Sequence, residues 1–104
     1  MVRVQETIYR RPLGSEALVD VRFLTIRGRV IDYAVVLLAV ELSEPRAVRL
    51  YDNAHGDHDM HRYNRDGVKQ QAETFHRGSA DEALQSAIQA VRNGYGEMIG
   101  SWRR

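Results

Sequence analysis

Cysteine is absent from this chain of 104 residues, which excludes a disulfide scaffold, a thiolate zinc site and a catalytic cysteine. Long apolar runs are absent as well: the longest, residues 34–40, is far short of the roughly 20 residues that span a bilayer. The first residues contain no apolar segment typical of a signal peptide. We therefore expect a soluble, cytoplasmic protein with no membrane contact.

Proline and lysine are both scarce. The two prolines, Pro12 and Pro45, stand where we expect turns. Lys69 is the only lysine among 15 basic residues, and the rest are arginine, yet the net charge is only +1. Arginine binds phosphate through two N–H groups at once, so an arginine-rich face could hold RNA. A genome-wide preference for arginine codons is the simpler explanation of the same composition.

The remaining composition is that of an ordinary globular domain. With 43% hydrophobic residues, the chain can bury roughly two thirds of its unfolded surface in a core of its own. No internal repeat, low-complexity tract or linker interrupts it. Residues 1–104 are therefore predicted to form a single domain.

Branched and aromatic residues predict strands in the first half of the chain. Residues 33–40 show no polar alternation, which predicts a central strand that is apolar on both faces. Val48 and Leu50 alternate with Arg49 and Tyr51, as expected for a strand with one solvated face. The expected strands cover residues 2–11, 18–26, 30–42 and 47–51, with a turn at residues 27–29.

A further hairpin is indicated by Asp66-Gly67, which predicts a two-residue type I′ turn. Such a turn places His61 opposite Ala72. Because the flanking residues are mostly polar, we expect an edge ribbon or a loop.

A capping box, Ser79-Ala80-Asp81-Glu82, predicts the start of a helix. Gly94 and Gly96 leave open whether this helix is continuous or ends and restarts. The order of elements predicts an α+β fold, with an antiparallel sheet of four to six strands and a C-terminal amphipathic helix packed on one face. The residues expected to face the sheet are Leu84, Ala87, Ile88, Val91, Tyr95, Met98, Ile99 and Trp102.

One helix covers only one face of such a sheet, so the second apolar face of the central strand requires another cover. A dimer mate or a partner protein would supply it. Curled N-terminal strands or a folded-over loop would supply it within the chain.

The most concentrated chemistry lies in three of the four histidines, His55, His58 and His61, which directly follow the fourth strand. Such a loop can transfer protons near neutral pH or coordinate a metal. RNA cleavage by the 2′-hydroxyl needs a base, an acid and a cation for the phosphate. The candidate catalytic residues are therefore His55, His58, His61, Arg49, Arg62 and Tyr63, with no cofactor.

The neighbouring carboxylates, Asp52, Asp57 and Asp59, repel a phosphodiester unless they orient the histidines or hold a metal. A mixed His/Asp metal site is chemically reasonable, although the spacing matches no established zinc signature. The simplest alternative is a solvated polar loop whose side chains cap one another and the backbone.

Residues 49–55 (Arg-Leu-Tyr-Asp-Asn-Ala-His), followed by His58, His61 and the capped helix from Ser79, resemble the TumE-like toxin components of bacterial toxin–antitoxin systems. The resemblance extends over residues 30–102. It implies a toxin–antitoxin module with a cognate antitoxin as partner and RNA as target.

Three functional hypotheses follow. The first is a toxin-like, metal-independent endoribonuclease that uses the His-rich loop. The second is a non-enzymatic module that forms homo-oligomers or binds a partner through the twice-apolar strand. The third is a metal-binding protein that uses the His/Asp cluster.

Overall fold

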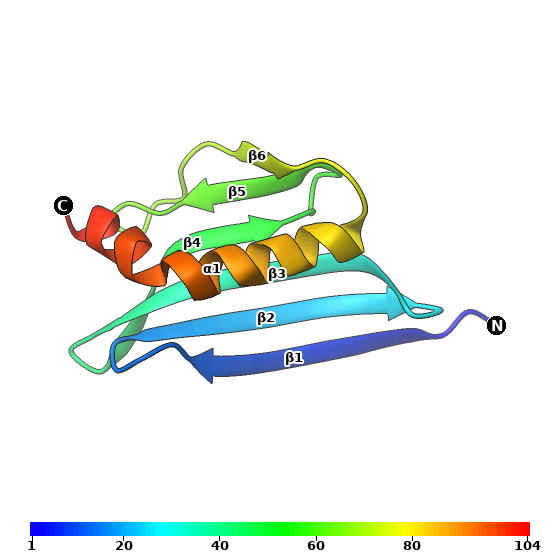
Figure 1. Ribbon diagram of the computed structural model, residues 1–104, viewed down its shortest axis with the longest axis horizontal. Coiled ribbons are helices and arrows are strands. Elements are labelled where there is room, and N and C mark those ends of the chain that lie inside the picture. The colour runs from blue at the N-terminus through cyan, green and yellow to red at the C-terminus, as the bar shows by residue number, and fades with distance from the viewer.

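Each strand of the chain pairs antiparallel with the next, which gives a six-stranded sheet in the order β1 to β6. The computed structural model, which describes residues 1–104, places one helix across one face of this sheet (Figure 1). The α+β fold predicted from the sequence is therefore confirmed. The elements are β1 (Val4–Pro12), β2 (Ala17–Ile26), β3 (Arg29–Glu41), β4 (Glu44–Asp52), β5 (His58–Arg62), β6 (Glu73–His76) and α1 (Ala80–Arg103).

Two tight turns connect the three central strands. Arg27 and Gly28 (φ 53° and 77°) link β2 to β3, and Leu42 and Ser43 (φ 51° and 67°) link β3 to β4. Two successive positive φ angles match the twist of antiparallel strands, as in a type I′ turn. The second turn lacks glycine, so its sequence gave no signal.

Both prolines lie in strands rather than in turns, which corrects our expectation. Pro12 is the last residue of β1, and Pro45 is the second residue of β4. Proline is tolerated near a strand end or on an edge strand, where its missing N–H interrupts no essential ladder bond.

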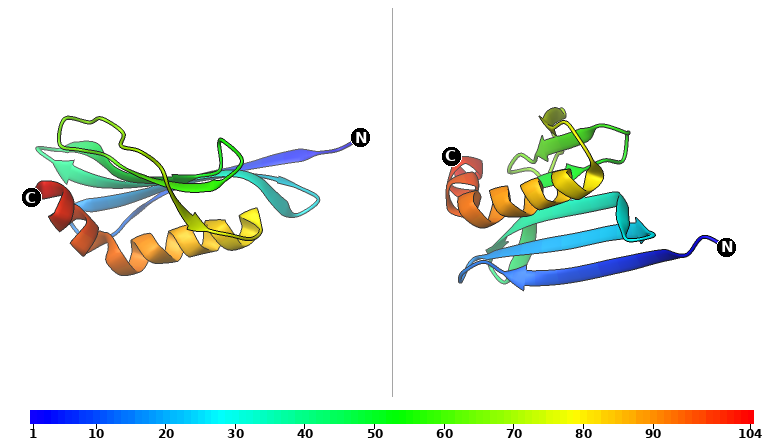
Figure 2. Two further views of the ribbon diagram at one scale, coloured as in Figure 1. Left: turned by 90° about the horizontal axis from the view of Figure 1, so that it is seen from above. Right: turned by 45° about the vertical axis from the view of Figure 1, so that its right-hand side comes forward.

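The core lies between α1 and the sheet. On the face of β3 toward the helix, Tyr33, Val35, Leu37 and Ala39 are completely buried. The helix is continuous through Gly94 and Gly96, and its axis bends in the C-terminal half (Figure 2). The helix residues buried against the sheet are Ala83, Leu84, Ala87, Val91, Ile99 and Trp102, which confirms the predicted apolar stripe.

The other face of β3 carries Ala34, Val36 and Leu38, and no helix lies over it (Figure 2). The strand is central and apolar on both faces, as predicted. The N-terminal strands do not curl over this face, because β1 continues the sheet beyond β2. A dimer mate, a partner or a folded-over loop as its cover therefore stays a prediction.

Strand β4 does not have the expected solvated face. Tyr51 lies opposite Val35 and is buried in the core, where its ring meets Phe75 edge-on. An irregularity in the β3–β4 register brings Val48 into the core as well. A bulge of this kind breaks the strict alternation on which the prediction rested.

The β5–β6 hairpin has the predicted register next to Met60, but its turn and the residues beside the turn differ, because Tyr63 pairs with Lys69, one residue out of that register. Met60 pairs with Glu73, the register in which His61 falls opposite Ala72. The turn has three residues rather than two: the Asn64 N–H donates to the Val68 carbonyl at 3.0 Å, and Gly67 adopts φ 81°. This is the type I turn with a following left-handed glycine that closes three-residue hairpins. As expected, the hairpin forms one edge of the sheet.

No helix of the chain has the length and apolar character needed to cross a membrane.

Candidate anion-binding site

The three clustered histidines do not share a pocket. His61 lies opposite Leu50, on the face of the sheet away from α1. His58 lies two residues before the core residue Met60 and so faces the helix side. His55 is exposed in the turn between β4 and β5.

His58 is fully engaged in structural hydrogen bonds. Its Nε2 lies 2.9 Å from the Gly78 carbonyl, which only accepts, so Nε2 carries the proton. Its Nδ1 therefore accepts from the Tyr33 hydroxyl at 2.8 Å. Burial, and then the charges of Asp52 and Asp59, raise the pKa of Tyr33 above its usual value, which keeps this hydroxyl a donor. His58 thus joins β5, β3 and the segment before α1.

His61 has a similar structural role on the other face. It is buried, and its Nδ1–H donates to the Gln70 carbonyl at 2.9 Å. The Gln70 N–H donates in turn to the Arg62 carbonyl at 2.7 Å. These bonds fix the segment between β5 and β6 against β5.

The acidic residues of the cluster do not complete a metal site. No three His, Asp or Glu side chains anywhere in the chain lie close enough together to hold a metal ion. The alternative mixed His/Asp metal site, with Asp52, Asp57 and Asp59, is therefore not assembled in the structure.

Arginines gather instead in a pocket of about 440 Å³ between β4, β5, the following turn and the C-terminal end of α1. We call it the arginine pocket. It contains three of the six predicted site residues, Arg49, Arg62 and Tyr63. Its complete lining is Val48, Arg49, Arg62, Tyr63, Asn64, Arg65, Asp66, Gln70, Met98, Ser101, Trp102 and Arg104.

Two arginines face each other across the strands that form the floor of this pocket. Arg49 on β4 is the direct register partner of Arg62 on β5. Like charges directly opposite one another destabilise a sheet. Arg62 is neutralised by an ion pair with Glu73, but Arg49 has no ion pair, and its Nε is buried without a hydrogen-bond partner. A buried donor of this kind is uncommon and costly in a folded protein.

Trp102 forms a rigid wall of the pocket. The Arg65 guanidinium lies 4.0 Å from the centre of its ring system, and Arg46 lies 5.2 Å from it. The indole N–H donates to the Asn64 carbonyl at 3.3 Å. Because arginines already lie against its ring, Trp102 does not offer a free platform for stacking a base.

Glu41 holds the arginines around Trp102. Its carboxylate lies 2.9 Å from Arg65, 3.3 Å from Arg46 and 3.4 Å from Arg103. Burial alone would raise the pKa of Glu41, but the hydrogen bonds and charges of these arginines outweigh it and lower that pKa. The wall of the pocket is therefore an ion-pair network, while Arg49 on its floor is left without an anion.

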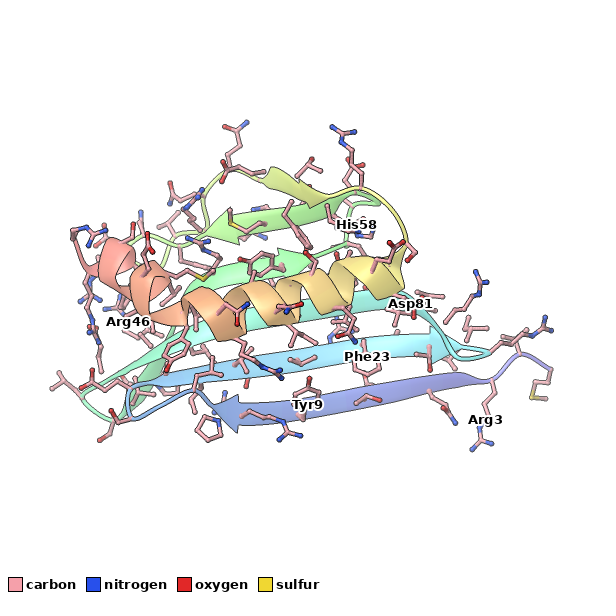
Figure 3. All side chains as sticks on the ribbon, in the orientation of Figure 1. Arg3, Tyr9, Phe23, Arg46, His58 and Asp81 are labelled. Carbon is pink, nitrogen blue, oxygen red and sulfur yellow. The ribbon has the colours of Figure 1, made fainter.

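The rings of Tyr33, Phe75 and His76 surround His58, and we call these four residues the His58 cluster. The arginine pocket and the His58 cluster lie at opposite ends of α1. In Figure 3, Arg46 is labelled beside the C-terminal part of the helix, and His58 lies near its N-terminal end. The His58 ring is thus separated along the molecule from the arginines around the C-terminal end of α1.

Over residues 2–102 the sequence matches the family described as Domain of unknown function (DUF7718). The chain belongs to this family. No curated protein and no solved structure matches the chain. The DUF7718 description names no activity, so the toxin role implied by the TumE-like resemblance stays a prediction.

Two of the four arginines in the pocket of this DUF7718 protein, Arg65 and Arg104, were not predicted from the sequence. Arg65 follows β5, and Arg104 lies at the end of α1, so only the topology brings them together. The Asp66-Gly67 turn was the one usable signal, because it returns the chain beside β5 and places Arg65 next to Arg62.

Proposed function

We propose that this DUF7718 protein is a non-enzymatic binding module that holds a phosphate group of RNA in the arginine pocket. The observation that carries the proposal is Arg49, a guanidinium whose buried Nε has no partner in a pocket lined by three further arginines. A phosphate in the pocket would supply the anion that the Arg49 guanidinium lacks.

The arrangement of charge supports an anion at this position. A phosphate beside Arg49 would neutralise this guanidinium, whose register partner Arg62 is already paired with Glu73. Arginine presents its N–H groups as a planar fork, which two phosphate oxygens can accept together. Tyr63 adds a hydroxyl to the same lining.

Two considerations favour RNA over other sources of phosphate. The TumE-like resemblance implies an RNA target. Phosphate contacts from arginine supply most of the affinity of proteins that bind RNA without reading its sequence, and such contacts need no base-stacking platform. A rigid, arginine-covered Trp102 is compatible with this mode of binding.

Binding without cleavage is favoured because no histidine lines the pocket. The Nδ1 of His61 is already bonded to the Gln70 carbonyl, and both ring nitrogens of His58 are occupied. General acid–base catalysis needs groups within hydrogen-bond reach of the reacting atoms.

The test is fluorescence anisotropy with a labelled single-stranded RNA of about 12 nucleotides. We expect Arg49→Ala to weaken binding about tenfold or more, because one charge-assisted contact contributes roughly 1.5–3 kcal/mol. Arg29→Ala is the matched control, since Arg29 lies at the start of β3 outside the arginine pocket. Equal affinity of the Arg49→Ala and Arg29→Ala variants, or no binding by the wild type, would contradict the proposal.

An endoribonuclease of a toxin–antitoxin pair is the second candidate, favoured by the gathering of Arg49, Arg62 and Tyr63 in one pocket. Its test is incubation of the purified protein with total RNA in EDTA. From the positions of the histidines we expect no specific fragments. Cleavage that is abolished in His61→Ala but retained in Arg29→Ala would favour the nuclease over the binding module.

A further inference from the structure

Strand β1 is a long open edge of the sheet. It has nine residues, pairs with β2 on one side in an unbroken register, and has no neighbour on the other side (Figure 1). The opposite edge, β6, has only four residues. Natural proteins blunt exposed edges with charged side chains (especially lysine), proline, bulges or short strands, because unpaired N–H and C=O groups invite another chain. β1 contains neither lysine nor a bulge, its one proline is its last residue, and its charges include both signs.

The hydrogen-bond pattern shows which backbone groups of β1 are free. The Leu13 N–H donates to the Ala17 carbonyl at 2.8 Å, so residues at odd positions of β1 point their backbone groups toward β2. Residues at even positions, including Glu6, Ile8 and Arg10, point their backbone N–H and C=O groups away from β2, toward the open edge. Pro12 is also an even position, so its missing N–H costs the β1–β2 ladder nothing.

The outward positions are arranged symmetrically about Ile8. Two residues before it stands Glu6, and two residues after it stands Arg10. In an antiparallel pair of two β1 strands centred on Ile8, each Glu6 therefore lies opposite the Arg10 of the second copy. Opposite charges at directly paired positions stabilise a ladder.

The side chains at these positions are available. Ile8 is 67% exposed, which is unusual for an isoleucine in a regular strand. Arg10 uses Nε and Nη2 on Asp20, at 2.6 and 2.8 Å, which leaves Nη1 for another carboxylate. Glu6 forms no ion pair within the chain.

We propose that β1 is the interface of a homodimer, in which two copies pair antiparallel about a two-fold axis through Ile8 and join their sheets into one. The interface is self-complementary, so it closes at two copies and leaves only the short β6 edges exposed. The two isoleucines pack against each other, and two Glu6–Arg10 pairs flank them.

A charge-exchange experiment tests this interface on the full chain by light scattering after size-exclusion chromatography. The wild type is expected at twice its 11.9 kDa chain mass. Glu6→Arg alone and Arg10→Glu alone each place like charges opposite one another, so both are expected as monomers. An equimolar mixture of the two variants restores opposite charges at every pair, and we expect it to give a dimer again.

A second pair of variants separates the edge from the uncovered face of the sheet. Ile8→Pro removes an outward N–H without touching the bonds to β2, so we expect a monomer with an unchanged far-ultraviolet circular dichroism spectrum. Val36→Asp on the uncovered face is expected to remain a dimer. A wild type that is monomeric at 100 µM (about 1 mg/mL for a chain of this mass), or a dimer that survives Ile8→Pro and is lost in Val36→Asp, overturns the proposal.

Discussion

The positions of single side chains in this protein depend on strand pairing and hydrogen bonds that the sequence only partly reveals. His58 and His61 differ by three positions, so in a strand they must face opposite sides, and this spacing already argued against a shared site. The spacing could not reveal that both rings form hydrogen bonds to main-chain carbonyls, His58 to Gly78 and His61 to Gln70. Arg49 was predicted as a phosphate ligand, and its buried Nε without a partner is the feature that keeps it a candidate.

The Tyr33–His58 bond gives a prediction at this scale. Tyr33→Phe removes the hydroxyl that donates to the His58 Nδ1 and leaves a partly buried acceptor without a partner. We expect a loss of about 1–3 kcal/mol in the free energy of unfolding, measured by urea denaturation. RNA affinity is expected to stay unchanged, because neither residue lines the arginine pocket.

Tyr9→Phe is the matched control for this substitution, since the Tyr9 ring packs on the core but its hydroxyl forms no hydrogen bond to another side chain or to the backbone. A Tyr33→Phe variant as stable as Tyr9→Phe would show that the His58 bond contributes nothing to folding.

At the scale of elements, local signals predicted most of the fold. The capping box placed the start of α1 correctly, and the apolar stripe identified its buried face. One turn without a local signal was missed. Leu42 and Ser43 adopt positive φ although neither is glycine, so β4 was predicted to start after Pro45 rather than at Glu44. The bulge in the β3–β4 pair was equally invisible, because register irregularities arise from packing between strands rather than within one.

The capping box also predicts a pH dependence. Hydrogen bonds from the Ser79 backbone and then from its side chain lower the pKa of Glu82. A carboxylate with a lowered folded-state pKa stabilises the protein above its ordinary pKa of about 4.3, and this contribution is lost as the pH falls through the lowered value. We therefore expect Glu82→Gln to lower the thermal midpoint at pH 7 and to match the wild type more closely at pH 3.

Glu97→Gln, an exposed position of the same helix outside the capping box, serves as the comparison for thermal unfolding. A difference between wild type and Glu82→Gln that stays constant from pH 7 to pH 3 would contradict the assignment to the Glu82 carboxylate (ordinary pKa about 4.3).

At the scale of the whole molecule, the arrangement separates two regions that the sequence places side by side. Arg49 and His55 are six positions apart in the sequence. The arginine pocket nevertheless lies at the C-terminal end of α1, and the His58 cluster lies near its N-terminal end (Figure 3). The pocket depends on contacts between residues such as Asn64 and Trp102, which are distant in the sequence. This is why the fold class and the helix could be predicted, whereas the complete lining of the pocket could not.

The most direct test of phosphate binding by Arg49 is the salt dependence of RNA affinity in the wild type and in Arg49→Gln. Each phosphate contact on a single strand contributes about 0.7 to the slope of log K against log salt. We expect the slope to become shallower by about 0.7 in Arg49→Gln and to stay unchanged in Arg29→Gln. Identical slopes for all three proteins would mean that Arg49 does not bind phosphate.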